Sequence, residues 1–485
     1  MSAAAQDFRW PPRLSPDAAS PPATLVAFDT FAPCTGRVRF GWPAAEEAER
    51  TPLSRSVSDD GGTTHHVLRL AGLPADTPVA YRAEADDGAA SPVRVFRTPP
   101  APGADVSSKF VFHGDMQGGL ATPSRVVFPY IEDLVRTMRA ERPLAVFQVG
   151  DMADEAYRTH GAGAEAWNDF FRLCRDEIAE TYFLPALGNH DCPPVPEEAD
   201  EPEPARFDRR AGLFHGLFAL PEPLGPREAA YALAVGPVRL VVLNTEADIA
   251  SQNAFLAREL QRGAFDPACR ALVLMEHRPP FSSVHYGGNE DVRKNWLPVF
   301  KRYEGTLVLS GHVHAYQRFS PFAPEGPVCL VTGGSGGYLF DEPSEAADRP
   351  DFATTCYHCV AAEVTQTDMI CRAVRSDGLV FDRFAIPLAR CVRVSPVFPE
   401  AGGEATVRFT LPEDAAEETG MRLLWEADGG GKTRTRKMER RGARRFATRI
   451  AIPATAREKI SFRFAADSAR LFDNAGFGWQ ALLAV

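Results

Sequence analysis

Five short apolar runs along the chain each end in residues that can bind a metal ion. The runs have the length of buried strands and are followed by glycine or polar residues. Their last residues lie in Gly114-Asp115, Gly150-Asp151, Gly188-Asn189-His190-Asp191, Glu276-His277 and Gly311-His312-Val313-His314. In open α/β sheets, ligands bind at the carboxyl ends of the strands. The five runs therefore predict an α/β fold with a ligand site at the ends of its strands.

The residue types at these strand ends suit two metal ions. Imidazole, carboxylate and amide groups are ligands for Fe, Zn and Mn. The expected ligands of the first ion are Asp115, Asp151 and His314. Those of the second are Asp151, Asn189, His277 and His312, so that the Asp151 carboxylate bridges the two ions. Two ions about 3.5–4 Å apart can stabilise both oxygens of an in-line displacement at phosphorus and produce hydroxide near neutral pH.

The order of these motifs resembles that of the calcineurin-like metallophosphoesterases. The flanking stretches, residues 277–283 and 312–318, resemble the purple acid phosphatase branch, and the likeness extends over roughly residues 24 to 390. It implies a four-layer α/β/β/α catalytic core in which metal-bound hydroxide attacks a phosphoester. It also implies that His190 and His285 orient the phosphoryl oxygens or protonate the leaving alkoxide, with Asp191 orienting His190.

Two positions depart from the family pattern. Purple acid phosphatases have a tyrosine ligand three residues after the bridging Asp, where this chain has Asp154. The wider superfamily has a histidine two residues after the first Asp, where this chain has Gln117. Asp154 or Gln117 can supply an oxygen ligand, or water can. The identity of the metals therefore stays open among Fe, Zn and Mn.

Length and composition exclude several classes of protein. A chain of 485 residues predicts about three domains, and 45% hydrophobic with 24% charged residues is typical of globular proteins. The net charge of −11 argues against a nucleic-acid partner, and no apolar run approaches the ~18 residues of a membrane span. No signal segment is visible and the nine cysteines are scattered, which predicts a cytoplasmic protein, or a secreted one if a signal has been removed.

The residue pattern divides the chain into four parts. Residues 1–22 are rich in Pro, Ala and Ser and are predicted to be a mobile arm. Residues 23–100 alternate short strands with turns, which favours a β-sandwich, and Leu73–Tyr81 resembles the fibronectin type III-like domain of plant-type purple acid phosphatases. Residues 105–389 are the expected catalytic domain. Residues 390–485 are predicted to be a second β-sandwich of unknown role.

Within the catalytic domain, three apolar stripes predict helices packed on the sheets. They run over Ile131–Met138, Trp167–Ile178 and Val292–Tyr303 at helical spacing. A further strand over Val238–Asn244 has no obvious ligand at its end.

Charged and aromatic segments leave alternatives open. Glu197–Pro204 is acidic and is either a solvated insertion or a loop that repels highly anionic substrates. Lys432, Arg434 and Arg436 are expected on one face of a strand, where they guard an edge against aggregation or bind an anionic partner. Phe472–Trp479 faintly resembles the end of some starch-binding modules, so a carbohydrate partner also stays open.

The sequence thus predicts an enzyme, most simply a phosphomonoesterase that acts on a small phosphoester with two metal ions. One alternative is a phosphodiesterase or nucleotide pyrophosphatase, because the same metal pair serves those reactions. The other is a binding protein whose metal core has lost activity through Gln117 and Asp154. The physiological substrate and the oligomeric state do not follow from the sequence.

Overall fold

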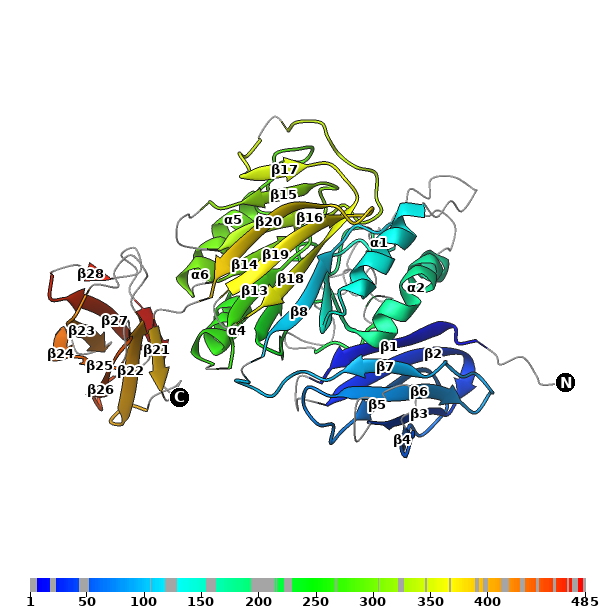
Figure 1. Ribbon diagram of the computed structural model, residues 1–485, viewed down its shortest axis with the longest axis horizontal. Coiled ribbons are helices and arrows are strands. Elements are labelled where there is room, and N and C mark those ends of the chain that lie inside the picture. The colour runs from blue at the N-terminus through cyan, green and yellow to red at the C-terminus, as the bar shows by residue number, and fades with distance from the viewer. Residues whose placement is uncertain are drawn as a thin grey trace, which may run out of the picture. The chain divides into compact units, whose positions relative to one another are not determined.

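The structure is a computed structural model of the chain (Figure 1). By its internal contacts the chain divides into two compact units, residues 1–260 with 271–387 and residues 261–270 with 388–485. The structure describes residues 7–17, 23–42, 52–104, 106–117, 129–153, 163–192, 214, 216–221, 229–266, 268–303, 305–321, 327–344, 347–365, 368–388, 392–395, 400–410, 418–427, 432–441, 445–456, 459–468, 471–472 and 479–482.

Two β-sheets form the centre of the first unit. Strands of the first pair in the order β20 (Val380–Pro387), β19 (Asp368–Arg375), β18 (His358–Val364), β8 (Ser108–His113), β9 (Ala145–Gln148), β10 (Tyr182–Pro185), β1 (Trp10–Pro16), β2 (Thr24–Cys34) and β5 (Thr63–Leu70). Strands of the second pair in the order β11 (Tyr231–Val235), β12 (Val238–Val242), β13 (Ala271–Met275), β14 (Leu307–Ser310), β16 (Val328–Thr332), β15 (Tyr316–Phe319) and β17 (Phe352–Thr354).

Helices cover these sheets and complete the predicted four-layer α/β core. The described helices are α1 (Pro129–Ala140), α2 (Gly163–Glu180), the short 3-10 helix η2 (Ala250–Gln252), α4 (Asn253–Phe265), α5 (Glu290–Asn295) and α6 (Leu297–Arg302). Figure 1 shows α1 and α2 beside the first sheet and α4, α5 and α6 beside the second. None of the described helices is both long enough and apolar enough to cross a membrane.

Parallel pairing brings the ends of the ligand-bearing strands together. In the first sheet, β9 lies between β8 and β10 and is parallel to both. In the second sheet, β13 and β14 are parallel neighbours. All residues of β9, β10, β13 and β14 are buried. This burial on both faces explains why the sequence of each strand is a continuous apolar run rather than an alternating one.

The apolar stripes predicted for the helices are confirmed as core. Trp167, Phe170 and Phe171 of α2 belong to one buried cluster that also contains Ile131 and Leu134 of α1. At the other sheet, the fully buried Trp296 donates an indole hydrogen bond to the Ile249 carbonyl at 3.1 Å. The helices are thus fixed by aromatic packing rather than by helix propensity alone.

Glu177 of α2 places a carboxyl group inside this core. Burial raises its pKa to about 8, against the opposing effects of a hydrogen bond with Cys174 and the charge of Arg139. Because the folded-state pKa exceeds the ordinary value of 4.5, the folded protein binds this proton more tightly than the unfolded chain. The contribution of Glu177 to stability is therefore lost progressively as the pH rises from about 4.5 to about 8.

We expect Glu177→Gln to remove this pH dependence and to raise the free energy of unfolding at pH 8 by roughly 3 kcal/mol. Urea unfolding at pH 5 and pH 8 measures the effect. Glu132→Gln, at an exposed position on α1, is the matched control. It should leave the free energy of unfolding unchanged at both pH 5 and pH 8. Parallel pH curves for the wild type and Glu177→Gln would contradict the expectation.

The N-terminal strands are continuous with the core. β1 pairs in parallel with β10, Leu14 lying opposite Tyr182, and β2 and β5 extend the same sheet. A second N-terminal sheet pairs in the order β4 (Arg55–Ser58), β3 (Gly36–Gly41), β6 (Pro78–Ala85) and β7 (Arg94–Arg97). The likeness of this β-rich part to a fibronectin type III domain stays a prediction.

The mobile arm predicted for residues 1–22 is wrong over Trp10–Pro16, which form β1. Trp10 and Leu14 are buried, and the buried Arg13 forms an ion pair with Asp29 at 2.5 Å. The proline-rich composition suggested mobility, but the strand is stabilised by contacts with residues far away in the sequence.

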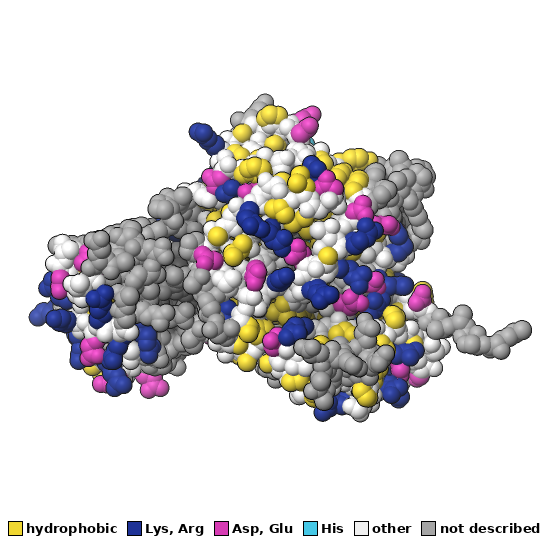
Figure 2. Space-filling model, viewed as in Figure 1, with side chains coloured by type: hydrophobic (Ala, Val, Ile, Leu, Met, Phe, Trp, Pro, Cys, Tyr) yellow, Lys and Arg dark blue, Asp and Glu magenta, His cyan; other side chains and the backbone are white. Residues whose placement is uncertain are grey.

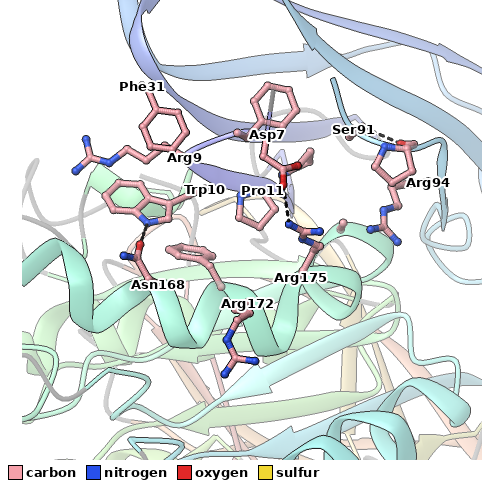
Figure 3. A pocket seen from close by; sticks show the side chains of 15 residues that line it. Asp7, Arg9, Trp10, Pro11, Phe31, Ser91, Arg94, Asn168, Arg172 and Arg175 are labelled. Atoms are coloured by element: carbon pink, nitrogen blue, oxygen red, sulfur yellow. Dashed lines mark hydrogen bonds and ion pairs between the residues drawn. The ribbon is translucent and has the colours of Figure 1, made fainter. Parts of the chain in front are cut away.

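A pocket of about 440 Å³ lies between the N-terminal strands and α2 (Figure 3). Its lining combines aromatic side chains, such as Trp10 and Phe31, with arginines. The Trp10 indole donates to Asn168 at 3.3 Å, and Arg175 pairs with Asp7 at 3.7 Å. None of the expected metal ligands lines this pocket.

The described strands of residues 388–485 form two small sheets, as expected for a β-sandwich. One has the order β21 (Val392–Ser395), β22 (Glu404–Thr410), β26 (Arg445–Ala451) and β25 (Glu439–Arg440). The other has the order β24 (Arg434–Lys437), β23 (Met421–Ala427), β27 (Lys459–Ala466) and β28 (Leu471–Phe472), with β29 (Trp479–Leu482) also on β27. Alternate apolar residues of both sheets, including Phe409 and Phe464, form a common core.

The basic residues of β24 lie at a sheet edge among the described strands. Arg434 is opposite the buried Trp425 and Arg436 is opposite the buried Leu423, so the two arginines lie on the same face of the sheet as these residues, but both are exposed. Figure 2 shows Lys and Arg side chains gathered over this part of the chain. Charged side chains on an edge strand are a known device against edge-to-edge pairing, so this position favours the guarding role. An anionic or carbohydrate partner stays a prediction.

The eight described cysteines are all free. Reduced thiols were expected from the sequence, and the cytoplasmic location stays a prediction.

Candidate metal centre

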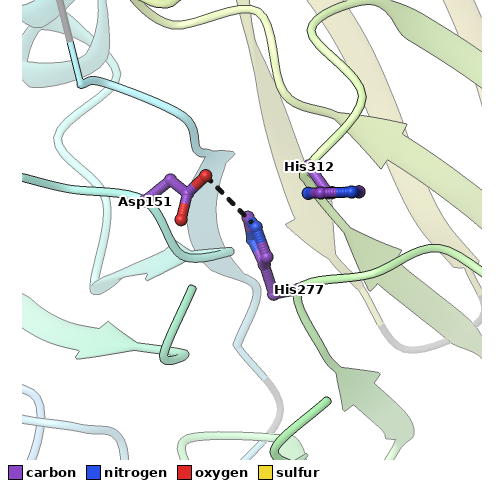
Figure 4. Close-up of side chains that lie close together, drawn as sticks. All are labelled: Asp151, His277 and His312. Carbon is purple, nitrogen blue, oxygen red and sulfur yellow. Dashed lines mark ion pairs between the residues drawn. The ribbon is translucent and has the colours of Figure 1, made fainter. Parts of the chain in front are cut away.

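Two groups of metal-type donors meet where strands of both sheets end. The donor atoms of Asp115, Asp151 and His314 lie within 4.8 Å of one another, and so do those of Asp151, His277 and His312. Figure 4 shows Asp151, His277 and His312 turned toward one another. Asp151 belongs to both groups, which is the arrangement expected of a bridging carboxylate.

Hydrogen bonds fix the histidine rings of the centre. His277 Nδ1 lies 2.9 Å from the Val149 carbonyl, so its Nε2 faces Asp151 Oδ2 at 3.3 Å and Asn189 Oδ1 at 3.0 Å. His314 Nδ1 lies 2.6 Å from the Tyr338 carbonyl. A carbonyl that accepts from one ring nitrogen leaves the other nitrogen free to bind a metal. These contacts therefore set the ligand atom of each ring.

The two sheets are also joined directly at the centre. The backbone N–H of His312, after β14, donates to the Asp115 carboxylate, after β8, at 2.9 Å. The His277 contact with Val149 makes a second link between the sheets. The donor groups are thus held by both layers and are largely preformed.

Three of the expected ligands have a left-handed backbone. The φ angles of Asp115, Asp151 and His312 are 61°, 56° and 64°. Such conformations cost about 1–3 kcal/mol each in non-glycine residues and persist only where the surroundings enforce them. Asp151 can take its position only because residue 188 is glycine. A Cβ atom at Gly188 would overlap the Asp151 carboxylate. Strain concentrated at one cluster points to a functional centre.

Asp191 supports the loop that carries Asp151. Its buried carboxylate accepts hydrogen bonds from four backbone groups, at 2.9–3.1 Å. The four donors are the N–H groups of Asp151, Met152, Ala153 and Gly188. These four described hydrogen bonds of the carboxylate go to the backbone, and the expected role in orienting the His190 ring stays a prediction. Contacts with backbone donors leave no pattern of residue types in the sequence.

Gln117 enters the first donor group, whereas Asp154 lies outside the described residues. Gln117 Nε2 is 2.9 Å from Asp151 Oδ2 and 3.2 Å from His314 Nε2. The other amide atom, Oε1, is buried without a hydrogen-bond partner. Because a half-turn of the amide exchanges its oxygen and nitrogen, Gln117 can present an oxygen to a metal at this position. The acidic segment Glu197–Pro204 also lies outside the described residues.

The Asp151 carboxylate and the His312 ring have charge states that suit bound cations. Burial would raise the pKa of Asp151, but the His277 imidazole and the His190 N–H lower it, so the carboxylate is ionised. Burial would lower the pKa of His277, but Asp151 and Asp115 raise it to about 10. Burial and the neighbouring His277 and Arg278 lower the pKa of His312, so that ring is neutral. An ionised Asp151 carboxylate and a neutral His312 imidazole are donors suited to Fe, Zn or Mn.

The two histidines expected to contact substrate occupy different positions. His190 follows Asn189, and its backbone N–H donates to Asp151 Oδ1 at 2.8 Å while its ring Nε2 lies 3.9 Å from Oδ2. His285 is exposed, has a left-handed φ of 54°, and packs on Phe340 and Tyr286. His190 therefore lies at the donor groups, and His285 lies in an aromatic cluster beside them.

Arg278 and Glu246 belong to the site but were missed in the sequence. The Arg278 guanidinium makes two hydrogen bonds with Glu246, at 2.6 and 3.0 Å, and its Nη1 lies 3.1 Å from His312 Nε2. Glu246 follows β12, the strand expected to have no ligand at its end. The available signal was that Arg278 comes directly after His277 and that β12, a strand of the same sheet, ends shortly before Glu246.

The family comparison agrees with this geometry. Residues 108–316 match the family model described as calcineurin-like phosphoesterase. This part of the chain is a calcineurin-like phosphoesterase domain. It contains both donor groups, from Asp115 to His314.

Individual relatives of the phosphoesterase domain are purple acid phosphatases. Purple acid phosphatase 1 of Ipomoea batatas is 25% identical over 292 residues, which is 56% of this chain and 58% of the relative. The Fe(3+)-Zn(2+) purple acid phosphatase 12 of Arabidopsis thaliana is 27% identical over 315 residues, 60% of this chain and 63% of the relative. The match thus spans about three fifths of the length of these relatives.

A solved structure shows the same fold. Purple acid phosphatase PPD1 from yellow lupin seeds superposes with a TM-score of 0.65 and 18% sequence identity. The superposition covers 78% of this chain and 74% of the lupin chain. The expected fold class is therefore confirmed.

Proposed function

We propose that the protein is a metal-dependent phosphomonoesterase that acts on a small phosphoester. The observation that supports this proposal is the pair of donor groups that share Asp151. Two bound cations of the Fe, Zn or Mn type would supply charge neutralisation at the phosphoryl oxygens and acidify a water molecule. The name of the Arabidopsis relative, an Fe(3+)-Zn(2+) phosphatase, supports a pair of this kind.

Different residues of the chain would hold the two ions, contact the phosphoryl oxygens and donate the proton. The first ion would be held by Asp115, Asp151 and His314, with an oxygen of Gln117, and the second by Asp151, Asn189, His277 and His312. The Arg278 guanidinium, fixed by Glu246, adds positive charge beside His312 where phosphoryl oxygens would lie. His190 is half-buried at the donor groups, where its ring can give a proton to the leaving alkoxide.

Elemental analysis combined with a substrate panel tests the proposal. We expect two metal ions per chain and at least about tenfold faster turnover of phenyl phosphate than of a diaryl phosphodiester. A preference for the diester or for a nucleotide pyrophosphate would support the alternative enzyme. Absence of turnover on the whole panel, in a protein without bound metal, would support the binding-protein alternative.

His190→Ala should lower turnover more on alkyl monoesters than on aryl monoesters. Poor leaving groups need a proton from a general acid, which contributes about 10²–10⁴-fold, whereas a phenolate leaves with less help. Steady-state kinetics on ethyl phosphate and phenyl phosphate give the two losses. Equal losses on both substrates would show that His190 positions the substrate and does not donate the proton.

A further inference from the structure

Aromatic side chains cover one face of two of the expected ligand histidines. The Tyr286 ring stacks on His312 with ring centroids 4.7 Å apart and an interplanar angle of 21°. The Phe340 ring stacks on His314 at 4.4 Å and 6°. The alcohol part of a bound phosphoester would therefore meet aromatic surface beside the donor groups.

His285 joins these rings into one cluster. It stacks on Phe340 at 4.2 Å and 20°, and meets Tyr286 edge-on at 3.9 Å and 73°. Tyr286 and Phe340 are themselves perpendicular at 6.0 Å. We refer to Tyr286, His285 and Phe340 as the aromatic platform.

The Tyr286 and His285 side chains of the aromatic platform are exposed and Phe340 is half-buried, yet the segment is firmly held. Tyr286 is 62% exposed, although the large side chains of the core around it are buried. His285 has a left-handed backbone, and its N–H donates to the Glu342 carbonyl at 2.9 Å. Just before it, Ser283 donates to Gln317 Oε1 through its N–H at 2.6 Å and its hydroxyl at 2.8 Å. An exposed ring in a strained and well-bonded segment is typical of a ligand-contacting surface.

We propose that the aromatic platform binds the alcohol part of the substrate and selects phosphoesters with a planar ring close to the ester oxygen, such as aryl and benzyl phosphates. This inference rests on the proposed function. Tyr286 lies directly on a ligand histidine, so a ring that stacks on its exposed surface must be near phosphorus. A nucleobase is separated from the phosphate by a ribose, so it is less well placed to stack on Tyr286 while the phosphate lies at the donor groups.

Two substrates matched in size and in alcohol acidity isolate the stacking contribution. Benzyl phosphate carries a planar ring, and cyclohexylmethyl phosphate carries a puckered ring at the same position. We expect kcat/KM to favour the benzyl ester by about tenfold, the order that ring stacking contributes. Tyr286→Ala should reduce this ratio to about one, whereas Tyr286→Phe should keep it because the ring remains. Phe31→Ala removes an aromatic residue that is 65% exposed on β2, and it should leave the ratio unchanged.

Binding of benzylphosphonate and cyclohexylmethylphosphonate, measured by titration calorimetry, separates this inference from the proposed function. A tenfold binding preference that depends on Tyr286, without turnover of either ester, would overturn the phosphomonoesterase proposal and support the aromatic platform. Equal or absent binding of the two phosphonates by the wild type would overturn the aromatic platform. A preference that survives Tyr286→Ala would overturn it as well.

Discussion

Asp151→Asn should lower the turnover of phenyl phosphate by at least about a hundredfold and reduce the metal content at both sites. The substitution removes the one charge that belongs to both donor groups. Changes to residues that only support a metal ligand already cost about 10–100-fold, so loss of the shared ligand should cost more. Steady-state kinetics and elemental analysis on the same preparation measure the two effects.

Asp133→Asn provides the control for Asp151→Asn, because it removes a carboxylate from an exposed position of α1. It should keep full activity and metal content. If Asp151→Asn retained activity within tenfold and still bound two metals, Asp151 would not be the bridging ligand.

Asp191→Ala should lower the free energy of unfolding by about 3–5 kcal/mol and weaken metal binding by about 10–100-fold. The substitution leaves four buried N–H groups of the loop at Asp151 without their acceptor. Asp191→Asn should not restore stability, since one side of its amide would point donors at two of these N–H groups. Urea unfolding and metal titration measure the two effects.

The two Asp191 variants also distinguish a supporting role from a role in chemistry. A residue that only holds the loop should affect metal affinity and stability together, and activity at saturating metal should recover in large part. Stability and metal affinity equal to the wild type in Asp191→Asn would contradict the role that the hydrogen bonds assign.

The clustering of the donor residues could be predicted from the sequence because each follows a buried strand. The apolar run, the glycine and the polar residue are neighbours in the chain, so short stretches carry the whole signal, as in Gly150-Asp151. The α/β core could be predicted for the same reason, since strands and helices leave local periodicities.

The missed features depend on contacts between distant residues. β1 is stabilised by pairing with β10 and by the ion pair of Arg13 with Asp29, neither of which leaves a local pattern. Arg278 and Glu246 act through each other across 32 positions of sequence. The hydrogen bonds of Asp191 end on backbone groups, which every residue has, so no residue type reveals them.

The pairing of β1 with β10 has a consequence for folding during synthesis. Tyr182 is made about 170 residues after Leu14, its partner in the sheet. At about 5–20 residues per second, roughly ten to thirty seconds pass before that partner leaves the ribosome. During this interval the β1 edge of the emerging sheet lacks its native neighbour and presents unpaired backbone groups. β1 therefore waits for its partner until residues up to Pro185 have been made, and this interval is the stage at which we expect the nascent chain to need protection by chaperones.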